Sequence, residues 1–363
     1  MKSFAALIVA FVVLLATAEP ASAATRLVLP EPSGPFPVGE TELHLVDPAR
    51  DDPWVGGPRE LMVGVHYPAV PTPGGRAPYM LPGAAQHFDA VTANGLLGLG
   101  TPPGTDWASV RTNARQNAPA LPGKVIVYSS GLGEPRTWGT STAEELASRG
   151  YVVVSIDNTY ESPEVQFPDG SVRTMIEPGD PDAFVRKALD VRVRDTSFVL
   201  DALGRRGLDV SRVGMVGQSA GGAAAAATMA VDPRVVAGVN LDGNLTWLDG
   251  SLMPAAANGL ARPFLLIGKD GETDTGPGWD AFLANTEGWA RQLRLLGSVH
   301  ATFTDAEALL PQLGITVGTL DPATAIRTQR AYVASFFDRW LHGQDNHLLD
   351  GPSPRYPEMA FVG

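Results

Sequence analysis

The stretch RVGMVGQSAGGAAAAA (residues 212–227) sets one serine among residues that have almost no side chain. The apolar run before the serine is typical of a buried parallel strand, and the alanines after it favour a helix. A Gly-x-Ser-x-Gly sequence between a strand and a helix predicts a nucleophile elbow, a turn so sharp that the serine is backbone-strained. Gly217 and Gly221 are then required, because side chains two positions from Ser219 would clash. The alternative is a glycine-rich turn with an idle serine.

The N-terminus has the pattern of a secretory signal. Lys2 precedes an apolar run over residues 4–18, which is shorter than the ~20 residues of a membrane span, and Ala21-Ser22-Ala23 fits the small-residue cleavage rule. We therefore expect a signal peptide over residues 1–23, cleaved near Ala23, and a secreted, extracellular protein with one catalytic domain over residues 24–363. The alternative is an uncleaved anchor.

Composition narrows the class of protein. The chain has 363 residues, of which 44% are hydrophobic, so it is long enough to bury a large core. It has no cysteine, which excludes disulfides, zinc-cysteine sites and a cysteine nucleophile. The net charge of −12 argues against nucleic acid as a partner. No later apolar stretch is long enough to span a membrane, and nothing in the pattern indicates an oligomeric state.

The remaining pattern predicts an α/β fold with a doubly wound, mostly parallel sheet and an antiparallel N-terminal edge. Residues 40–46 and 59–67 form that edge, and residues 68–122 form an irregular insertion: a lid-like loop or decoration at the sheet edge, with a possible helix over 84–93. Helices are expected over 141–149, with a capping box of Ser141 and Glu144 and a stop at Gly150, from Asp180-Pro181 to about Leu203, and from Asp321-Pro322 to Gly343. Strands are expected at KVIVYS (124–129), YVVVSID (151–157), RVGMVG (212–217), VVAGVNLD (235–242), PFLLIGKD (263–270) and RLLGSVH (294–300).

A serine hydroxyl needs a histidine to accept its proton and a carboxylate to orient that histidine. In this fold the chain order is serine, acid, histidine, and active sites lie at the carboxyl ends of the strands. Of the histidines that follow Ser219, His342 ends the last helix and His347 lies in a polar tail, which leaves His300 as the predicted base. Asp242 and Asp270 both end strands, and spacing alone barely separates them as the acid.

The oxyanion of acyl transfer needs two backbone N–H groups. We expect one from Ala220, directly after the serine, and the other from Leu132 in the loop Ser130-Gly131-Leu132-Gly133 after the strand KVIVYS. No metal or cofactor is expected. The chain has no His-Glu-x-x-His sequence, and the acidic run over residues 270–274 lacks the later glycine and glutamate of an EF-hand loop.

Four segments in this order give the chain a family resemblance: VYSSGLGEPRTWGTSTAEELASRGYVVVSIDN, VGQSAGG, VNLDGN and GSVHATFTD. They resemble the platelet-activating-factor acetylhydrolase-like esterases and lipases, which are α/β-hydrolases. The resemblance implies that the acid follows the strand after the elbow, which matches Asp242, and that Leu132 supplies an oxyanion amide. This family usually has histidine where the present chain has Ser130 and Gln218.

The sequence thus predicts a secreted serine carboxylic-ester hydrolase of the esterase or lipase type. Its catalytic residues would be Ser219, Asp242 and His300, and its substrate a small-molecule or lipid ester. Alternatives are a polyester hydrolase of the cutinase or PETase type, or an amidase, peptidase or acyltransferase with the same triad. A non-enzymatic binding protein is disfavoured because no triad member is missing.

Overall fold

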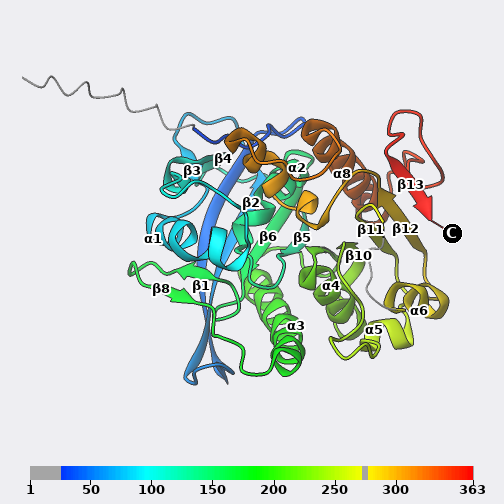
Figure 1. The fold of residues 1–363 in the computed structure, drawn as a ribbon, viewed down its shortest axis with the longest axis horizontal. Helices are drawn as coiled ribbons and strands as arrows, with labels where there is room; N and C mark the ends of the chain where they lie inside the picture. The colour runs from blue at the N-terminus through cyan, green and yellow to red at the C-terminus, as the bar shows by residue number, and fades with distance from the viewer. Residues whose placement is uncertain (1–25, 272–276, 363) are drawn as a thin grey trace, which may run out of the picture.

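The computed structural model describes residues 26–271 and 277–362, and Figure 1 shows their arrangement. Eleven strands form one sheet in the order β13-β12-β11-β10-β9-β5-β6-β2-β1-β4-β3, and β7 and β8 form a separate pair. The strands are β1 (Val38–Asp51), β2 (Pro58–Pro68), β3 (Arg76–Pro78), β4 (Arg111–Gln116), β5 (Lys124–Ser129), β6 (Tyr151–Asp157), β7 (Glu164–Gln166), β8 (Val172–Thr174), β9 (Val213–Gln218), β10 (Val235–Leu241), β11 (Phe264–Gly268), β12 (Ala290–Leu295) and β13 (Met359–Val362).

Helices cover both faces of the large sheet (Figure 1). The α-helices are α1 (Pro82–His87), α2 (Thr140–Ser148), α3 (Pro181–Arg205), α4 (Ala220–Val231), α5 (Pro254–Asn258), α6 (Gly278–Asn285), α7 (Ala306–Leu309) and α8 (Pro322–Phe337). Shorter 3₁₀ and π elements are η1 (Phe88–Leu96), η2 (Trp107–Ser109), η3 (Arg136–Gly139), η4 (His300–Phe303), η5 (Leu310–Leu313) and η6 (Asp338–His342). One core lies between the sheet and α3 to α6, and a second lies between the opposite face and α2 and α8.

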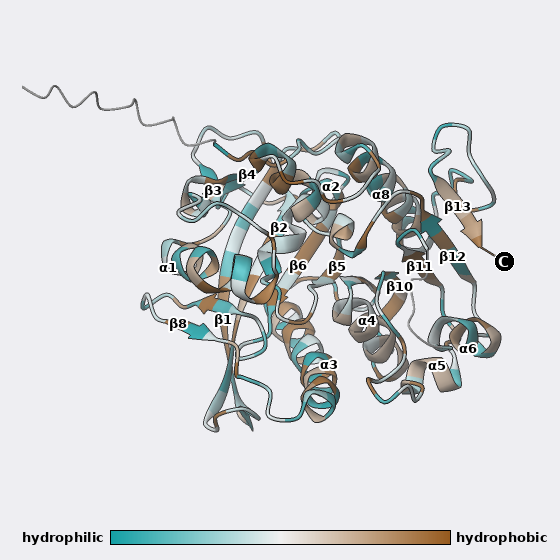
Figure 2. Cartoon of the chain, viewed as in Figure 1, coloured by the Kyte–Doolittle hydropathy of each residue, from teal (hydrophilic) through white to brown (hydrophobic). Residues whose placement is uncertain are grey.

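The centre of the sheet is parallel from β6 through β5, β9, β10 and β11 to β12, and both β2 and β13 pair antiparallel to it. This is an α/β-hydrolase fold, as predicted. The central strands are almost wholly buried because helices cover both faces, so they are rich in apolar residues, and β5 and β6 are largely coloured as hydrophobic in Figure 2. The parallel strands all end at one edge of the sheet, which gathers the segments after β5, β9, β10, β11 and β12.

The predicted helix starts at Pro181 and Pro322 are confirmed, with Asp180 and Asp321 as the caps. The predicted capping box of α2 is wrong. The helix begins at Thr140 after Gly139, the N–H of Ser141 is bound by Asp305, and the carboxylate of Glu144 accepts the N–H of Ala114. Tertiary partners thus replaced the local cap.

The strand predicted at RLLGSVH is also misplaced. The strand is β12, which ends at Leu295, and His300 begins the 3₁₀ element η4. Alternation of polar and apolar residues in ARQLRL is typical of the observed strand. Gly297 adopts a positive φ, which is incompatible with a strand that continues to His300.

Residues 68–122, predicted as irregular, contain β3, α1, η1, η2 and β4. Strand β4 pairs with β1, and β3 pairs with β4, so the segment extends the sheet. Phe88 packs edge-on against Trp107 and tilted against Trp138 in a third core. The possible helix predicted over 84–93 corresponds to α1 and η1, whereas β3, η2 and β4 were missed because β3 and η2 are short and β4, RTNARQ, has no apolar run.

Within residues 26–271 and 277–362, no helix has the length and apolar character needed to cross a bilayer. The predicted signal peptide, residues 1–23, lies outside the described residues, as do Glu272 and Asp274 of the acidic run.

Candidate active site

The elbow around Ser219 has the geometry that the sequence predicts. Ser219 adopts φ 55° and ψ −124° between β9 and α4. A Cβ on Gly217 would lie 2.1 Å from the backbone carbon of Gly221, and a Cβ on Gly221 would lie 2.0 Å from the carbonyl oxygen of Ser129. Both positions therefore exclude any side chain, and the serine stands at the end of its strand.

Asp242 and His300 are brought together at the same edge of the sheet. Oδ2 of Asp242 lies 2.5 Å from Nδ1 of His300, and Oδ1 accepts the backbone N–H of Lys269 at 3.0 Å. Asp242 has a φ of 55° and a side chain that is 1% exposed, whereas the His300 side chain is 48% exposed. Burial lowers the pKa of His300, but the hydrogen bond and charge of Asp242 outweigh burial, so the net pKa is raised above its ordinary value.

Asp270, the competing acid, is directed elsewhere. Its Oδ2 accepts the N–H of Gly297 at 2.9 Å and its Oδ1 accepts the N–H of Gly271. These bonds tie the loop after β11 to the turn after β12. The structure therefore places Asp242, and not Asp270, against His300.

Nε2 of His300 forms a hydrogen bond with Gln218, the residue before the serine. The amide Nε2 of Gln218 lies 3.0 Å from Nε2 of His300. No hydrogen bond joins Ser219 Oγ to His300 among the described residues, although both side chains line one cavity. Hydrogen bonds of catalytic groups are often long or misaligned before substrate binds.

Leu132 and Ala220 line the same cavity as Ser219. Among the described residues, neither the N–H of Leu132 nor that of Ala220 has a backbone acceptor. Ala220 begins α4, where the first N–H groups of a helix are unsatisfied and the helix dipole favours negative charge. The two N–H groups are thus available to an oxygen that becomes negative near Ser219.

Arg192 of α3 fixes the loop that carries Leu132. Its Nη2 donates to the carbonyl of Gly131 at 3.0 Å, its Nη1 donates to the carbonyl of Ser130 and to Oγ of Ser129, and its Nε donates to buried Glu161 at 2.5 Å. The C=O and N–H of a trans peptide point in opposite directions. Holding the Gly131 carbonyl against Arg192 therefore turns the N–H of Leu132 away from Arg192.

These groups surround a cavity of about 330 Å³. Apolar side chains from α3, from the start of α4 and from the segment after β10 form most of its wall. They are Val185, Ala188, Leu189, Ala223, Leu248 and Met253. Small-molecule sites are commonly about 300–1,000 Å³ and mostly apolar with a few polar groups, which is the character of this one.

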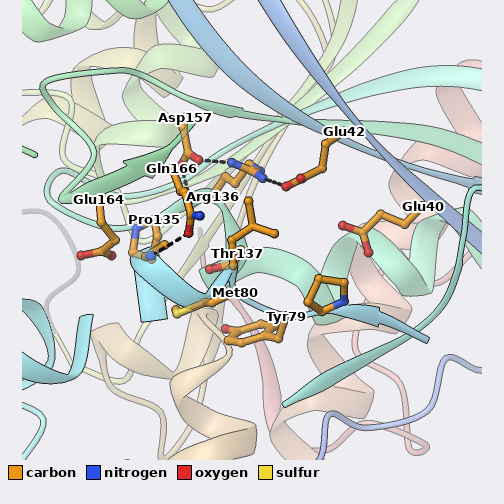
Figure 3. Close-up of a pocket in the computed structure, with 13 residues that line it drawn as sticks. Glu40, Glu42, Tyr79, Met80, Pro135, Arg136, Thr137, Asp157, Glu164 and Gln166 are labelled. Carbon is orange, nitrogen blue, oxygen red and sulfur yellow. Dashed lines mark hydrogen bonds and ion pairs between the residues drawn. The ribbon is translucent and has the colours of Figure 1, made fainter. Parts of the chain in front are cut away.

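A second cavity near the sheet edge is polar and has a volume of about 30 Å³, enough for water and too small for an ester. Figure 3 shows Arg136 at its wall, between the carboxylates of Asp157 and Glu42. Asp157 also accepts the backbone N–H of Arg136 at 2.8 Å. This network anchors the start of η3, where the loop after β5 ends.

Possible metal ligands lie away from this site. In the described part of the chain, one group of three acidic or histidine side chains has ligand atoms within 4.8 Å of one another: Asp345, His347 and Asp350. All three are exposed, and none lines the cavity that contains Ser219.

Sequence reasoning missed Arg192 and Glu161, and treated Gln218 only as a departure from the family. A signal for Arg192 was present. It lies on the buried face of α3 with Ala188, Asp195 and Val199, and a charged residue in an apolar stripe indicates a buried partner. Nothing local to Glu161 indicates that it meets Arg192.

The chain was compared with known proteins. No family model matches it. It is 30% identical over 389 residues to a probable 1-alkyl-2-acetylglycerophosphocholine esterase of Arthroderma benhamiae, covering 96% of this chain and 97% of that protein. It is 23% identical over 324 residues to the platelet-activating factor acetylhydrolase of Canis lupus familiaris, covering 70% of this chain and 71% of that protein.

Among solved structures, a ferulic acid esterase from Streptomyces cinnamoneus superposes with a TM-score of 0.78 and 36% identity, over 93% of this chain and 99% of that one. The fungal relative and the Streptomyces structure are both named as esterases, and both match nearly the whole fold described above. The chain is a carboxylic ester hydrolase and belongs to the platelet-activating-factor acetylhydrolase-like esterases of the α/β-hydrolase fold.

Proposed function

We propose that the chain hydrolyses esters by a covalent mechanism in which Ser219 is the nucleophile, His300 the general base and Asp242 the residue that orients the base. The 2.5 Å contact between Asp242 and His300, at the rim of the cavity that contains Ser219, is the observation that carries this proposal. Asp242 fixes the proton on Nδ1 of His300, so that Nε2 has the lone pair that must accept the serine proton.

In the first half of the reaction, Ser219 Oγ attacks the ester carbonyl while its proton passes to Nε2 of His300. The carbonyl oxygen becomes negative, and the N–H groups of Ala220 and Leu132 stabilise it. The intermediate collapses, the C–O bond to the alcohol breaks, and His300 returns the proton to the departing alcohol. Water then attacks the acyl-enzyme by the same route, which releases the acid and restores Ser219.

The substrate proposed is an ester whose acyl group is apolar and larger than acetyl. The apolar wall and the volume of about 330 Å³ support this choice, since an acetyl group would leave most of the cavity unfilled. One relative is named for an acetylated glycerophosphocholine and the solved structure for ferulic acid, so both acyl sizes occur among similar proteins. We further propose that the protein is secreted after cleavage of residues 1–23.

A panel of p-nitrophenyl esters from acetate to palmitate, together with a feruloyl ester, one anilide and one polyester film, tests this proposal. The ratio kcat/KM should rise from acetate to medium or aromatic acyl groups, and the anilide and the film should react far more slowly. Preference for acetate would contradict the acyl assignment. Comparable rates on the anilide would favour the amidase alternative, and release of soluble products from the film would favour the polyesterase.

A further inference from the structure

Gln218 holds the atom of His300 that the proposed mechanism needs free. Gln218 is fully buried at the end of β9, next to Ser219. Because Nδ1 of His300 shares its proton with Asp242, Nε2 has a lone pair, and the amide Nε2 of Gln218 donates to it at 3.0 Å. In this state Ser219 must compete with Gln218 for the same lone pair.

The other end of the Gln218 amide faces Glu134. Its Oε1 is buried and has no hydrogen-bond partner among the described residues. A Cβ on Gly131 would lie 2.6 Å from this oxygen and 2.7 Å from Oε2 of Glu134, so both oxygens border one small space beneath Gly131. A protonated carboxyl group of Glu134 could donate to Oε1, which otherwise has no hydrogen-bond partner among the described residues.

Glu134 titrates in the range where this matters. Burial raises the pKa of Glu134 to about 7, against the opposing effects of the Gly131 N–H, of His300 and of Arg192. The charge of Glu134 also acts on the phenol of Tyr128, and Asp242 and Lys269 act with Glu134 on the pKa of His300. Near neutral pH both charge states of Glu134 are therefore populated.

The two charge states favour opposite orientations of the amide. Protonated Glu134 donates to Oε1 of Gln218, which directs the amide N–H group to the lone pair of neutral His300. Ionised Glu134 repels Oε1 and attracts the amide N–H group. A half-turn of the amide then presents Oε1 to His300, where it accepts Nε2–H of the imidazolium.

We propose that Gln218 is a positioning residue that, by rotation of its amide, couples the ionisation of Glu134 to the proton affinity of His300. The inference rests on the proposed role of His300 as the base. No bond is made or broken in the rotation. When Glu134 is protonated, the amide N–H of Gln218 occupies Nε2 of His300. When Glu134 is ionised, the amide oxygen faces His300 instead, so Nε2 is free to accept the proton of Ser219 and the resulting imidazolium can donate to that oxygen.

The test is an NMR titration of His300 in full-length protein labelled with ¹⁵N-histidine, with the signal assigned by its loss in His300→Ala. Four proteins form a cycle: the native chain, Glu134→Gln, Gln218→Met and the double variant. Glu134→Gln should lower the pKa of His300, because it removes the negative charge that supports the imidazolium and also removes the ionised state that would turn the Gln218 amide. In the Gln218→Met background only the charge effect remains, so the shift should be smaller by roughly 0.5–1 pH unit, the equivalent of one net hydrogen bond.

Equal shifts in the two backgrounds would overturn the coupling, because Glu134 would then act on His300 through space alone. Gln329→Met, which replaces a buried glutamine of α8, is the control and should leave the titration unchanged. If circular dichroism shows that Gln218→Met does not fold, Gln218→Asn replaces it, since the shorter amide cannot reach His300. The titration needs no turnover, so it reads the coupling even if loss of Ser219 fails to abolish esterase activity.

Discussion

Asp242 reaches His300 across 58 residues of sequence, with its Oδ2 2.5 Å from Nδ1 of the imidazole, while its Oδ1 accepts the N–H of Lys269. The hydrogen bond from Lys269 fixes the orientation of the Asp242 carboxylate, so that only Oδ2 faces His300. The parallel strands β10 and β11, with β12 beyond them, create this meeting, because the segment after each strand emerges at the same edge.

Replacing Asp242 by asparagine should lower kcat by roughly 10³–10⁴. The Oδ1 of asparagine would keep the bond to Lys269 and turn its N–H₂ toward His300, which favours the tautomer with the proton on the wrong nitrogen. Steady-state kinetics with a p-nitrophenyl ester measure the loss. Asp270→Asn is the matched control and should change kcat little, since Asp270 binds backbone N–H groups of Gly271 and Gly297. A larger loss in the control would reverse the assignment of the acid.

Ser219 should be labelled covalently by an organophosphonate, and peptide mapping should place the adduct in VGQSAGG. Labelling should slow strongly in His300→Ala, because an unassisted serine hydroxyl is barely reactive. Ser219→Ala should fold like the native chain, as it removes one hydroxyl, and should keep only the residual rate, about 10³–10⁴ over water, that the oxyanion site and binding supply. A Ser219→Ala protein with native turnover would refute the nucleophile.

Arg192→Lys should lower kcat roughly 10- to 100-fold with little change in KM, at most the loss seen when one oxyanion donor is removed. Lysine keeps the charge beside Glu161 but cannot bind the carbonyls of Ser130 and Gly131 together, so the N–H of Leu132 loses its orientation. Arg194→Lys, in the same helix but on an exposed pair with Asp190, serves as the control. Identical kinetics in the two variants would show that Arg192 does not position the loop.

Glu40→Gln should stabilise the fold at alkaline pH and leave it unchanged below about pH 4. Burial, together with the charges of Glu144 and Glu42, raises the pKa of Glu40 to about 8. Between pH 4.5 and 8 the folded chain thus holds a proton that the unfolded chain releases, so the free energy of unfolding falls as pH rises. Glutamine removes this loss.

The gain from Glu40→Gln should be on the order of 4 kcal/mol at pH 8. Urea unfolding of both proteins at pH 4 and pH 8 measures it. The same difference at both pH values would mean that Glu40 is ionised in the folded chain.

The sequence by itself determined the elbow, the parallel strands on either side of it and the choice of Ser219 and His300 as candidates. These features are local: the glycines have no side chain because the turn has no room for one, and buried strands are apolar along their whole length. The same local logic located α3 and α8, whose caps are adjacent to their first residues.

Only the tertiary structure decided which aspartate meets His300, what occupies the imidazole Nε2 and how the loop carrying Leu132 is held. Asp242 and Asp270 each follow a parallel strand, and the geometry of two turns separates them. Arg192 and Gln218 act through atoms of residues distant in sequence, so no spacing reveals their partners. Side-chain contacts across elements depend on how the helices and strands pack, and a linear pattern reports only the face that each residue presents.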